Sequence, residues 1–197
     1  MKAITPDMTT KFNKQFQANI KQQALQRAVV KNGITASAEN VSAHVENTPV
    51  FSIDLATGKV ANQMQSGRCW MFAALNTFRH KMLNQFHLKE FELSQNYTFF
   101  WDKYEKANYF YENIIATGKE AIDSRKVAFL LATPQQDGGQ WDMIVSLFQK
   151  YGVVPKSVMP ESANSSNSRD LNNYLNKLLR KDAVVLRKMV AQGETLD

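Results

Sequence analysis

Hydrophobic residues recur along most of this chain at spacings of three and four, which is the pattern of α-helices that bury one face. The clearest pattern runs from residue 69 to about residue 85 and consists mostly of good helix formers. Its hydrophobic face carries Phe72, Leu75, Phe78, Met82 and Leu83. Residues 92–95 are expected to cap a second long helix with an aromatic face, made up of Tyr97, Phe100, Trp101, Tyr104 and Tyr111. This spacing favours a packed helix face over a base-stacking platform, which would need the aromatic residues on a strand.

Other segments predict further helices and very little strand. Thr5 and Pro6 mark the start of a first helix, as its cap and its first helical residue, and a second helix is expected to end at Gly33. Later helices are predicted over 120–131, over 140–151 and, after a polar linker, over about 169–189. Residues 50–55 alternate between apolar and polar and predict one short strand, whereas residues 35–47 are small and polar and predict no firm structure. The chain is therefore expected to be mainly α.

Composition indicates a globular chain. It has 197 residues, of which 44% are hydrophobic, and this is enough for one good core. No apolar run approaches the roughly 20 residues that span a bilayer, and the first seven residues lack the apolar block of a secretory signal. The single cysteine cannot form an internal disulfide. Together these features predict a cytoplasmic protein that contacts no membrane.

The net charge of +6 favours a well-solvated basic surface, and it leaves open a contact with nucleic acid. The candidates for such a contact lie in the last predicted helix and are Lys177, Arg180, Lys181, Arg187 and Lys188. These residues interleave with leucines at helical spacing. That arrangement is typical of the solvent-exposed side of an amphipathic helix.

The candidate chemistry is centred on Cys69, which lies where a polar turn containing Gly67 leads into the strongest helix pattern. In a first helical turn, unpaired N–H groups and the positive end of the helix dipole stabilise a thiolate relative to the thiol. Gly67 lets the backbone pass close beneath a substrate, and Trp70 is expected to shield the thiol from water. Gln63 lies six residues earlier, where its amide is placed to donate a hydrogen bond to the oxyanion that forms when a thiolate attacks a carbonyl.

The run from residue 63 to residue 74 resembles the sequence around the nucleophile of the papain-like cysteine peptidases. Gln63 and Cys69 match that family's oxyanion glutamine and nucleophile in type and spacing. The finer resemblance is to one branch of the family, the bleomycin hydrolase and bacterial aminopeptidase C group. The run departs from the secreted members at Ser66, where they carry a second cysteine, and at Arg68, where they carry a small residue. Loss of the disulfide partner suits a reducing compartment.

Gly138 and Gly139 precede a predicted helix and leave a backbone edge on which an extended peptide can pair. The pair resembles the Gly-Gly loop that lines the substrate cleft of papain-like peptidases, which implies contact with the substrate. An ordinary tight turn that caps the helix remains the alternative.

A thiol nucleophile needs a base, because an imidazole takes the thiol proton and later protonates the leaving amine. His80 lies eleven residues after Cys69 on the same predicted helix, about 16 Å along its axis, which is too far to reach the sulfur. His87 is farther along the chain, and His44 lies in a segment without predicted structure. All three are expected to be surface or packing residues. In the resembled family the catalytic His and Asn lie downstream on a β-rich half, so the chain is expected to be an N-terminal fragment that lacks them.

The resemblance implies an α+β papain-like fold, of which this chain would be the mainly helical half, carrying the nucleophile and lacking the β-rich half. The expected division is 1–49 for N-terminal helices and an arm, 50–160 for the helical half of the catalytic domain, and 161–197 for the start of a helical appendage. The implied function is a cytoplasmic thiol aminopeptidase of broad specificity. Such an enzyme hydrolyses the N-terminal residues of peptides through a cysteine acyl-enzyme and uses no metal or organic cofactor. The fragment is expected to be inactive alone.

The resembled group assembles as a homohexameric barrel with its active sites inside, and it uses its own C-terminus to limit cleavage to peptide ends. Because that segment is absent from this chain, endopeptidase activity stays open. The alternative from another class is a non-catalytic helical binding module in which Cys69 is an inert, buried thiol.

Overall fold

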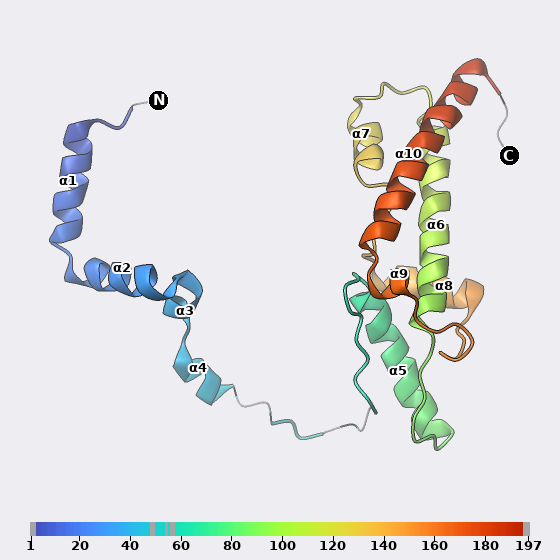
Figure 1. Cartoon of the computed structure of the whole chain (residues 1–197), viewed down its shortest axis with the longest axis horizontal. Helices are drawn as coiled ribbons and strands as arrows, with labels where there is room; N and C mark the ends of the chain where they lie inside the picture. Colours follow the sequence, from blue (N-terminus) through green and yellow to red (C-terminus); the bar gives the residue numbers. More distant parts are fainter. Residues whose placement is uncertain (1–2, 48–49, 54, 56–57, 195–197) are drawn as a thin grey trace. The chain divides into compact units, whose positions relative to one another are not determined.

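The computed structural model describes residues 3–47, 50–53, 55 and 58–194 (Figure 1). The chain divides into two compact units, Met1–Asp54 and Leu55–Asp197. Within the described residues, no helix is long and apolar enough to cross a membrane.

The first unit consists of short helices that bury little. Its elements are α1 (Pro6–Gln17), α2 (Ile20–Asn32), α3 (Ile34–Ala38) and α4 (Val41–Glu46). The predicted start of α1 is confirmed, because the Thr5 hydroxyl accepts a hydrogen bond from the Met8 N–H at 3.4 Å. Gly33 ends α2 with a φ of 81°, in the region that favours glycine. None of these helices contains a buried residue.

Two predictions for residues 35–55 are wrong. Residues 35–47, which predicted no firm structure, contain the end of α3 and all of α4. The strand predicted over 50–55 is absent from residues 50–53 and 55, and residue 54 lies outside the described residues. A lone strand leaves its backbone groups unpaired, and alternation in the sequence supplies no partner strand.

The second unit is also helical. Its elements are α5 (Cys69–Gln85), α6 (Gln95–Ala116), α7 (Arg125–Ala132), α8 (Trp141–Tyr151), α9 (Ala163–Ser166) and α10 (Arg169–Gln192). The predicted bounds of α5 are confirmed, and Ser94 caps α6 by accepting the Tyr97 N–H at 3.0 Å. The helix predicted from residue 120 begins at Arg125, because Ser124 provides the cap. Among the described residues, the β pairing is limited to two isolated bridges, Gln65 with Asn167 and Leu93 with Pro155.

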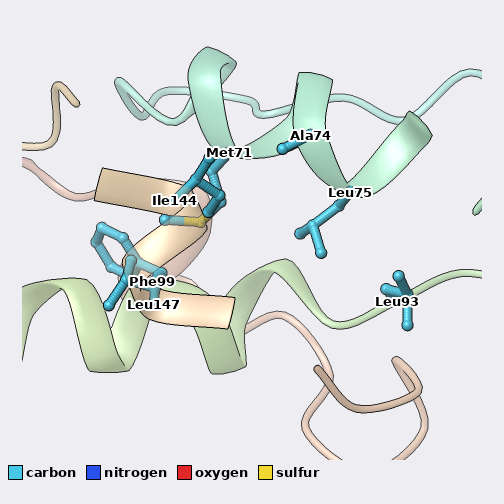
Figure 2. Packing of buried hydrophobic residues seen from close by; sticks show 7 residues of the cluster. All are labelled: Met71, Ala74, Leu75, Leu93, Phe99, Ile144 and Leu147. Atoms are coloured by element: carbon cyan, nitrogen blue, oxygen red, sulfur yellow. The ribbon is translucent and has the colours of Figure 1, made fainter. Parts of the chain in front are cut away.

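The first hydrophobic core joins α5, α6 and α8 (Figure 2). Its buried members are Met71, Ala74, Leu75, Leu93, Phe99, Ile144 and Leu147. Met71, Ala74 and Leu75 lie in the first two turns of α5, directly after the cysteine. Burial of these side chains fixes the end of α5 that carries Cys69. Each large aliphatic side chain contributes about 1.5–3 kcal/mol of burial free energy.

A second core joins α6, α7 and α10, and α10 lies along α6 (Figure 1). Its buried members are Phe110, Ile114, Leu130, Leu179 and Ala183. Two arginines of α10 bind backbone carbonyls of other elements. Arg180 donates to Leu131 and Ala132 at 2.7 and 2.8 Å, and Arg187 donates to Thr117 at 2.9 Å. These two candidates for a nucleic-acid contact therefore satisfy carbonyls at the ends of α7 and α6. The division into 1–49, 50–160 and 161–197 stays a prediction.

Candidate active site

Cys69 is the first residue of α5 and is exposed. The Arg68 carbonyl accepts the N–H groups of Met71 and Phe72, both at 3.0 Å, and so begins the helix at this point. The thiol therefore lies at the positive end of a 17-residue helix, where an anion is favoured. This is the position that the sequence predicts for it.

The loop before Cys69 is held by a chain of hydrogen bonds that starts at Gln63. The Ser66 hydroxyl donates to the Gln63 carbonyl at 2.7 Å, and Arg68 Nε donates to the Ser66 hydroxyl at 2.7 Å. The side-chain oxygen of Gln63 is buried and has no hydrogen-bond partner among the described residues. The loop thus fixes the Gln63 backbone, whereas the buried oxygen of its side-chain amide makes no hydrogen bond within the described part of the chain.

Arg68 is a buried cation with 0% of its surface exposed. Its two terminal nitrogens form a fork with the Glu161 carboxylate, at 3.0 and 2.9 Å. The guanidinium also lies over the rings of Phe72 and Phe99, at 5.0 and 5.2 Å from their centres. A planar guanidinium suits this site because it binds a carboxylate with two bonds and stacks on aromatic faces.

A second group of contacts is centred on Asp137, which binds residues from three segments. Its carboxylate accepts the Gly67 N–H at 2.9 Å and the Lys103 ammonium at 2.8 Å. It also accepts from Asn172 at 2.8 Å and from the Ser168 hydroxyl. Burial alone raises the pKa of Asp137, but these donors outweigh it, so the pKa of this carboxyl lies well below its usual range. Asp137 is therefore ionised at neutral pH and ties the loop before Cys69 to α6 and α10.

The lysine that faces Asp137 is itself buried. Burial lowers the pKa of Lys103, and the hydrogen bond and charge of Asp137 act against that shift. The Lys103 ammonium also donates to the Gln136 carbonyl at 3.0 Å and to the Asn172 side-chain oxygen at 2.7 Å. A second lysine, Lys106, donates to the Gly138 carbonyl at 2.7 Å. Two lysines of α6 therefore fix the backbone of the loop that contains the glycine pair.

The two glycines have different surroundings. A Cβ on Gly139 would lie 2.4 Å from the indole of Trp70, whereas a Cβ on Gly138 would meet nothing within 4 Å. The indole N–H of Trp70 donates to the Asp137 carbonyl at 2.9 Å. Gly139 thus lets the residue after Cys69 pack on the loop, and Gly138 leaves the backbone open. Similarly, a Cβ on Gly67 would lie 2.9 Å from the Cβ of Asp137, so that glycine permits a close approach within the protein.

A cavity of about 880 Å³ opens beside the glycine pair, between α6, α7 and α8. Gly138 and Gly139 line one edge of it, and the aromatic residues Tyr109, Phe129 and Tyr151 contribute to its walls. A volume of this size lies within the range of small-molecule sites in proteins.

The histidines of the second unit do not approach the thiol. His80 lies in α5 eleven residues after Cys69, about 16 Å along the axis, and its Nε2 contacts the Asn84 amide at 3.1 Å. His87 follows the end of α5. His44 belongs to the first unit, where it contacts Glu39 at 3.0 Å. The described residues contain no group of three or more His, Cys, Asp or Glu that could hold a metal ion.

The sequence did not reveal the partners that hold the loops. Lys103, Asp137 and Glu161 lie far from Cys69 in the chain and carry no local motif. The one indication was Arg68, a charged residue at a position where a small one is expected by resemblance. A charge placed between a glycine turn and a buried helix start requires a partner, but its identity follows only from the fold.

Comparison with known proteins shows the family to which this chain belongs. The sequence profile of the Peptidase C1-like family matches residues 3–197. The chain belongs to this family. Aminopeptidase C of Streptococcus thermophilus is 62% identical over 193 residues, which is 98% of this chain and 43% of that protein. Aminopeptidase C of Lactococcus lactis subsp. lactis is 59% identical over 96% of this chain and 43% of the relative.

A solved structure has the same fold over the part of it that this chain matches. The crystal structure of PepW from Lactobacillus rhamnosis HN001 superposes with a TM-score of 0.93 and 62% identity, over 98% of this chain and 43% of that one. The fold is therefore papain-like, and this chain spans less than half the length of the relatives that it matches. The resemblance to the aminopeptidase C group is confirmed.

Proposed function

We propose that Cys69 is the nucleophile of a cytoplasmic thiol aminopeptidase that removes N-terminal residues from peptides. The observation that carries this proposal is the exposed thiol at the first residue of α5, with Gln63 on the loop that leads into it. Membership of the peptidase C1-like family and the names of the aminopeptidase C relatives support it.

The reaction proceeds through an acyl-enzyme. The Cys69 sulfur attacks the first peptide carbonyl, and the electron pair of the C=O bond moves to its oxygen. The Gln63 side-chain N–H and the Cys69 backbone N–H donate to this oxyanion. The C–N bond then breaks, the amine leaves with a proton, and water hydrolyses the thioester to release the amino acid and the thiol. A His and an Asn from outside residues 1–197 supply the base and its orientation.

In this proposal, the backbone of Gly138 and Gly139 pairs with the substrate. Lys106 holds the Gly138 carbonyl in place, and Gly138 is exposed, whereas Trp70 packs against Gly139. By resemblance the full-length enzyme forms a homohexamer. A nucleic-acid contact remains an alternative for the three lysines of the original set, Lys177, Lys181 and Lys188, because the two arginines bind backbone carbonyls.

The non-catalytic alternative requires a buried, inert thiol. The exposure of Cys69 opposes it, and so does the buried polar framework on both sides of this residue.

The test compares the full-length gene product with its Cys69→Ser variant on an aminoacyl peptide. We expect turnover by the first and none by the second. We also expect purified residues 1–197 to show no turnover, because the positive end of a helix supplies no proton to the departing amine. Turnover by residues 1–197 that is lost on Cys69→Ser would show that this chain contains a base, and His44 would be the first to replace.

A further inference from the structure

The residue directly before the nucleophile uses every nitrogen of its side chain. Arg68 Nε donates to Ser66, and the two terminal nitrogens donate to Glu161. The guanidinium itself is shielded from water, because the Arg68 side chain has no exposed surface, whereas the Glu161 side chain keeps 24% of its surface exposed. The Glu161 carboxylate also accepts the Ser165 hydroxyl at 2.6 Å, which fixes the carboxylate in turn.

The same two segments are joined through their backbones. The Gln65 N–H donates to the Ser166 carbonyl at 2.9 Å, and the Ser168 N–H donates to the Gln65 carbonyl at 3.3 Å. Loop 63–68 is thus attached to residues 161–168 at two places, the isolated bridge at Gln65 and the ion pair at Arg68. The bridge holds the middle of the loop and the ion pair holds the end that enters α5.

The ion pair reaches Gln63 through Ser66. The Ser66 hydroxyl accepts from Arg68 and donates to the Gln63 carbonyl. A hydroxyl that accepts from a cation donates more strongly. The Gln63 backbone is therefore held, and its side-chain oxygen is buried without a partner.

We propose that Arg68 and Glu161 are positioning residues that set the direction of the Gln63 amide through Ser66. This inference rests on the proposed function for its effect on catalysis. Neither residue touches a reacting atom. Their effect on the rate passes through Gln63, which stabilises the oxyanion more strongly than it binds the ground state.

The kinetic test uses Arg68→Lys and Ser66→Ala in the full-length gene product. Lysine keeps the charge but loses the fork and the Nε donor. Ser66→Ala leaves the Arg68–Glu161 pair intact and serves if Arg68→Lys does not fold. Arg125→Lys, at an exposed residue at the start of α7, is the matched control. We expect each loop variant to lower kcat about tenfold with KM changed less than about twofold, and the control to change neither.

A double-mutant cycle with Gln63→Ala separates positioning from general stability. If the effect passes through Gln63, Arg68→Lys and Ser66→Ala should change kcat less than about twofold once Gln63 is alanine. An unchanged tenfold loss in the Gln63→Ala background would overturn the proposal.

Amide hydrogen exchange on residues 1–197 tests the same contacts without turnover. The Gln65 and Gly67 N–H groups are both hydrogen-bonded, and we expect them to exchange at least about tenfold faster in the loop variants than in Arg125→Lys. If the wild type shows no turnover, the proposed function fails on its own, and faster exchange would still support the structural part of the inference. Unchanged exchange at both amides would overturn it.

Discussion

Buried charges fix both the loop before Cys69, residues 63–68, and the loop that contains the glycine pair, residues 135–140. The two loops differ in which charged groups make the contacts. In loop 63–68 the contacts converge on a guanidinium, and they hold a backbone carbonyl while leaving the Gln63 side-chain oxygen without a partner. In loop 135–140 the contacts converge on the Asp137 carboxylate, which pairs with Lys103 of α6. Lys106 of the same helix binds the backbone carbonyl of Gly138. The first arrangement fixes the backbone of Gln63 and leaves its side-chain oxygen without a hydrogen bond from the described residues. The second makes a rigid edge.

This difference predicts where substitutions act. Changes at Asp137 and Gly139 in loop 135–140 should reduce stability, because they uncover a buried charge or displace Trp70. A change at Gln63 in loop 63–68 should reduce the rate with less effect on stability, because its side-chain oxygen has no hydrogen bond to lose among the residues that the structure describes. The following predictions run from the largest expected effect to the smallest.

Asp137→Ala should be the most damaging change. It leaves the Lys103 ammonium buried without its carboxylate and removes the acceptor of the Gly67 N–H. Loss of one member of a buried ion pair costs about 3–5 kcal/mol. Urea unfolding of residues 1–197 would measure it, with Asp123→Ala at an exposed loop position as the control. An equal loss of stability in the two variants would contradict the assigned role of Asp137.

Gln63→Ala should act on the rate. We expect kcat of the full-length gene product to fall about a hundredfold, equivalent to about 2.7 kcal/mol of transition-state stabilisation, with KM little changed. The free energy of unfolding should stay within about 1 kcal/mol of the wild type, because the buried side-chain oxygen has no partner to lose. Steady-state kinetics beside urea unfolding would show both. Unchanged turnover would remove Gln63 from the mechanism.

Gly139→Val and Gly138→Val should differ although the residues are adjacent. A Cβ on Gly139 enters the Trp70 ring, whereas a Cβ on Gly138 meets open space. We expect Gly139→Val to cost about 1–3 kcal/mol of stability through overpacking and to change the fluorescence of Trp70. Gly138→Val should fold normally and weaken peptide binding by blocking the backbone edge. Normal peptide binding by a folded Gly138→Val protein would leave the pair with a structural role alone.

Ionisation of Asp137 should make a smaller contribution, which appears in the way the free energy of unfolding depends on pH in acid. Because its pKa is lower in the folded protein than in the unfolded chain, its contribution is present above the unfolded value of about 3.9 and is lost as the pH falls through the folded value. Below about pH 4 the wild type should therefore lose stability more steeply than Asp137→Asn, by at most about 1.4 kcal/mol per pH unit. Parallel curves below pH 4 would show that this carboxyl is not held ionised by the fold.

The helices of the second unit could be read largely from the sequence. Cys69 begins α5 and Tyr151 is the last residue of α8, as predicted, because caps and periodicity are local properties of the chain. The prediction of a strand over 50–55 was wrong for the opposite reason, because a strand depends on a partner strand that no local pattern supplies. The prediction of no firm structure over 35–47 was wrong because a short polar helix gives only a weak hydrophobic pattern.

Only part of the candidate site could be predicted from the sequence. Cys69 and Gln63 could be singled out as candidates because they share one short run, and the glycine pair because it directly precedes a predicted helix. The different surroundings of Gly138 and Gly139 could not be foreseen, because they depend on where Trp70 packs. The pairing of Arg68 with Glu161 joins residues that lie 93 positions apart, and only the fold brings them together.

The central claim is that Cys69 attacks the substrate carbonyl. The most direct measurement is the intact mass of the full-length gene product, rapidly quenched in acid after mixing with an aminoacyl ester, followed by peptide mapping. The account predicts an added acyl group on Cys69, joined as a thioester with release of the alcohol, and no added mass in Cys69→Ser. An enzyme that still hydrolyses the ester in the Cys69→Ser variant, or an acyl group mapped to any other residue, would contradict it.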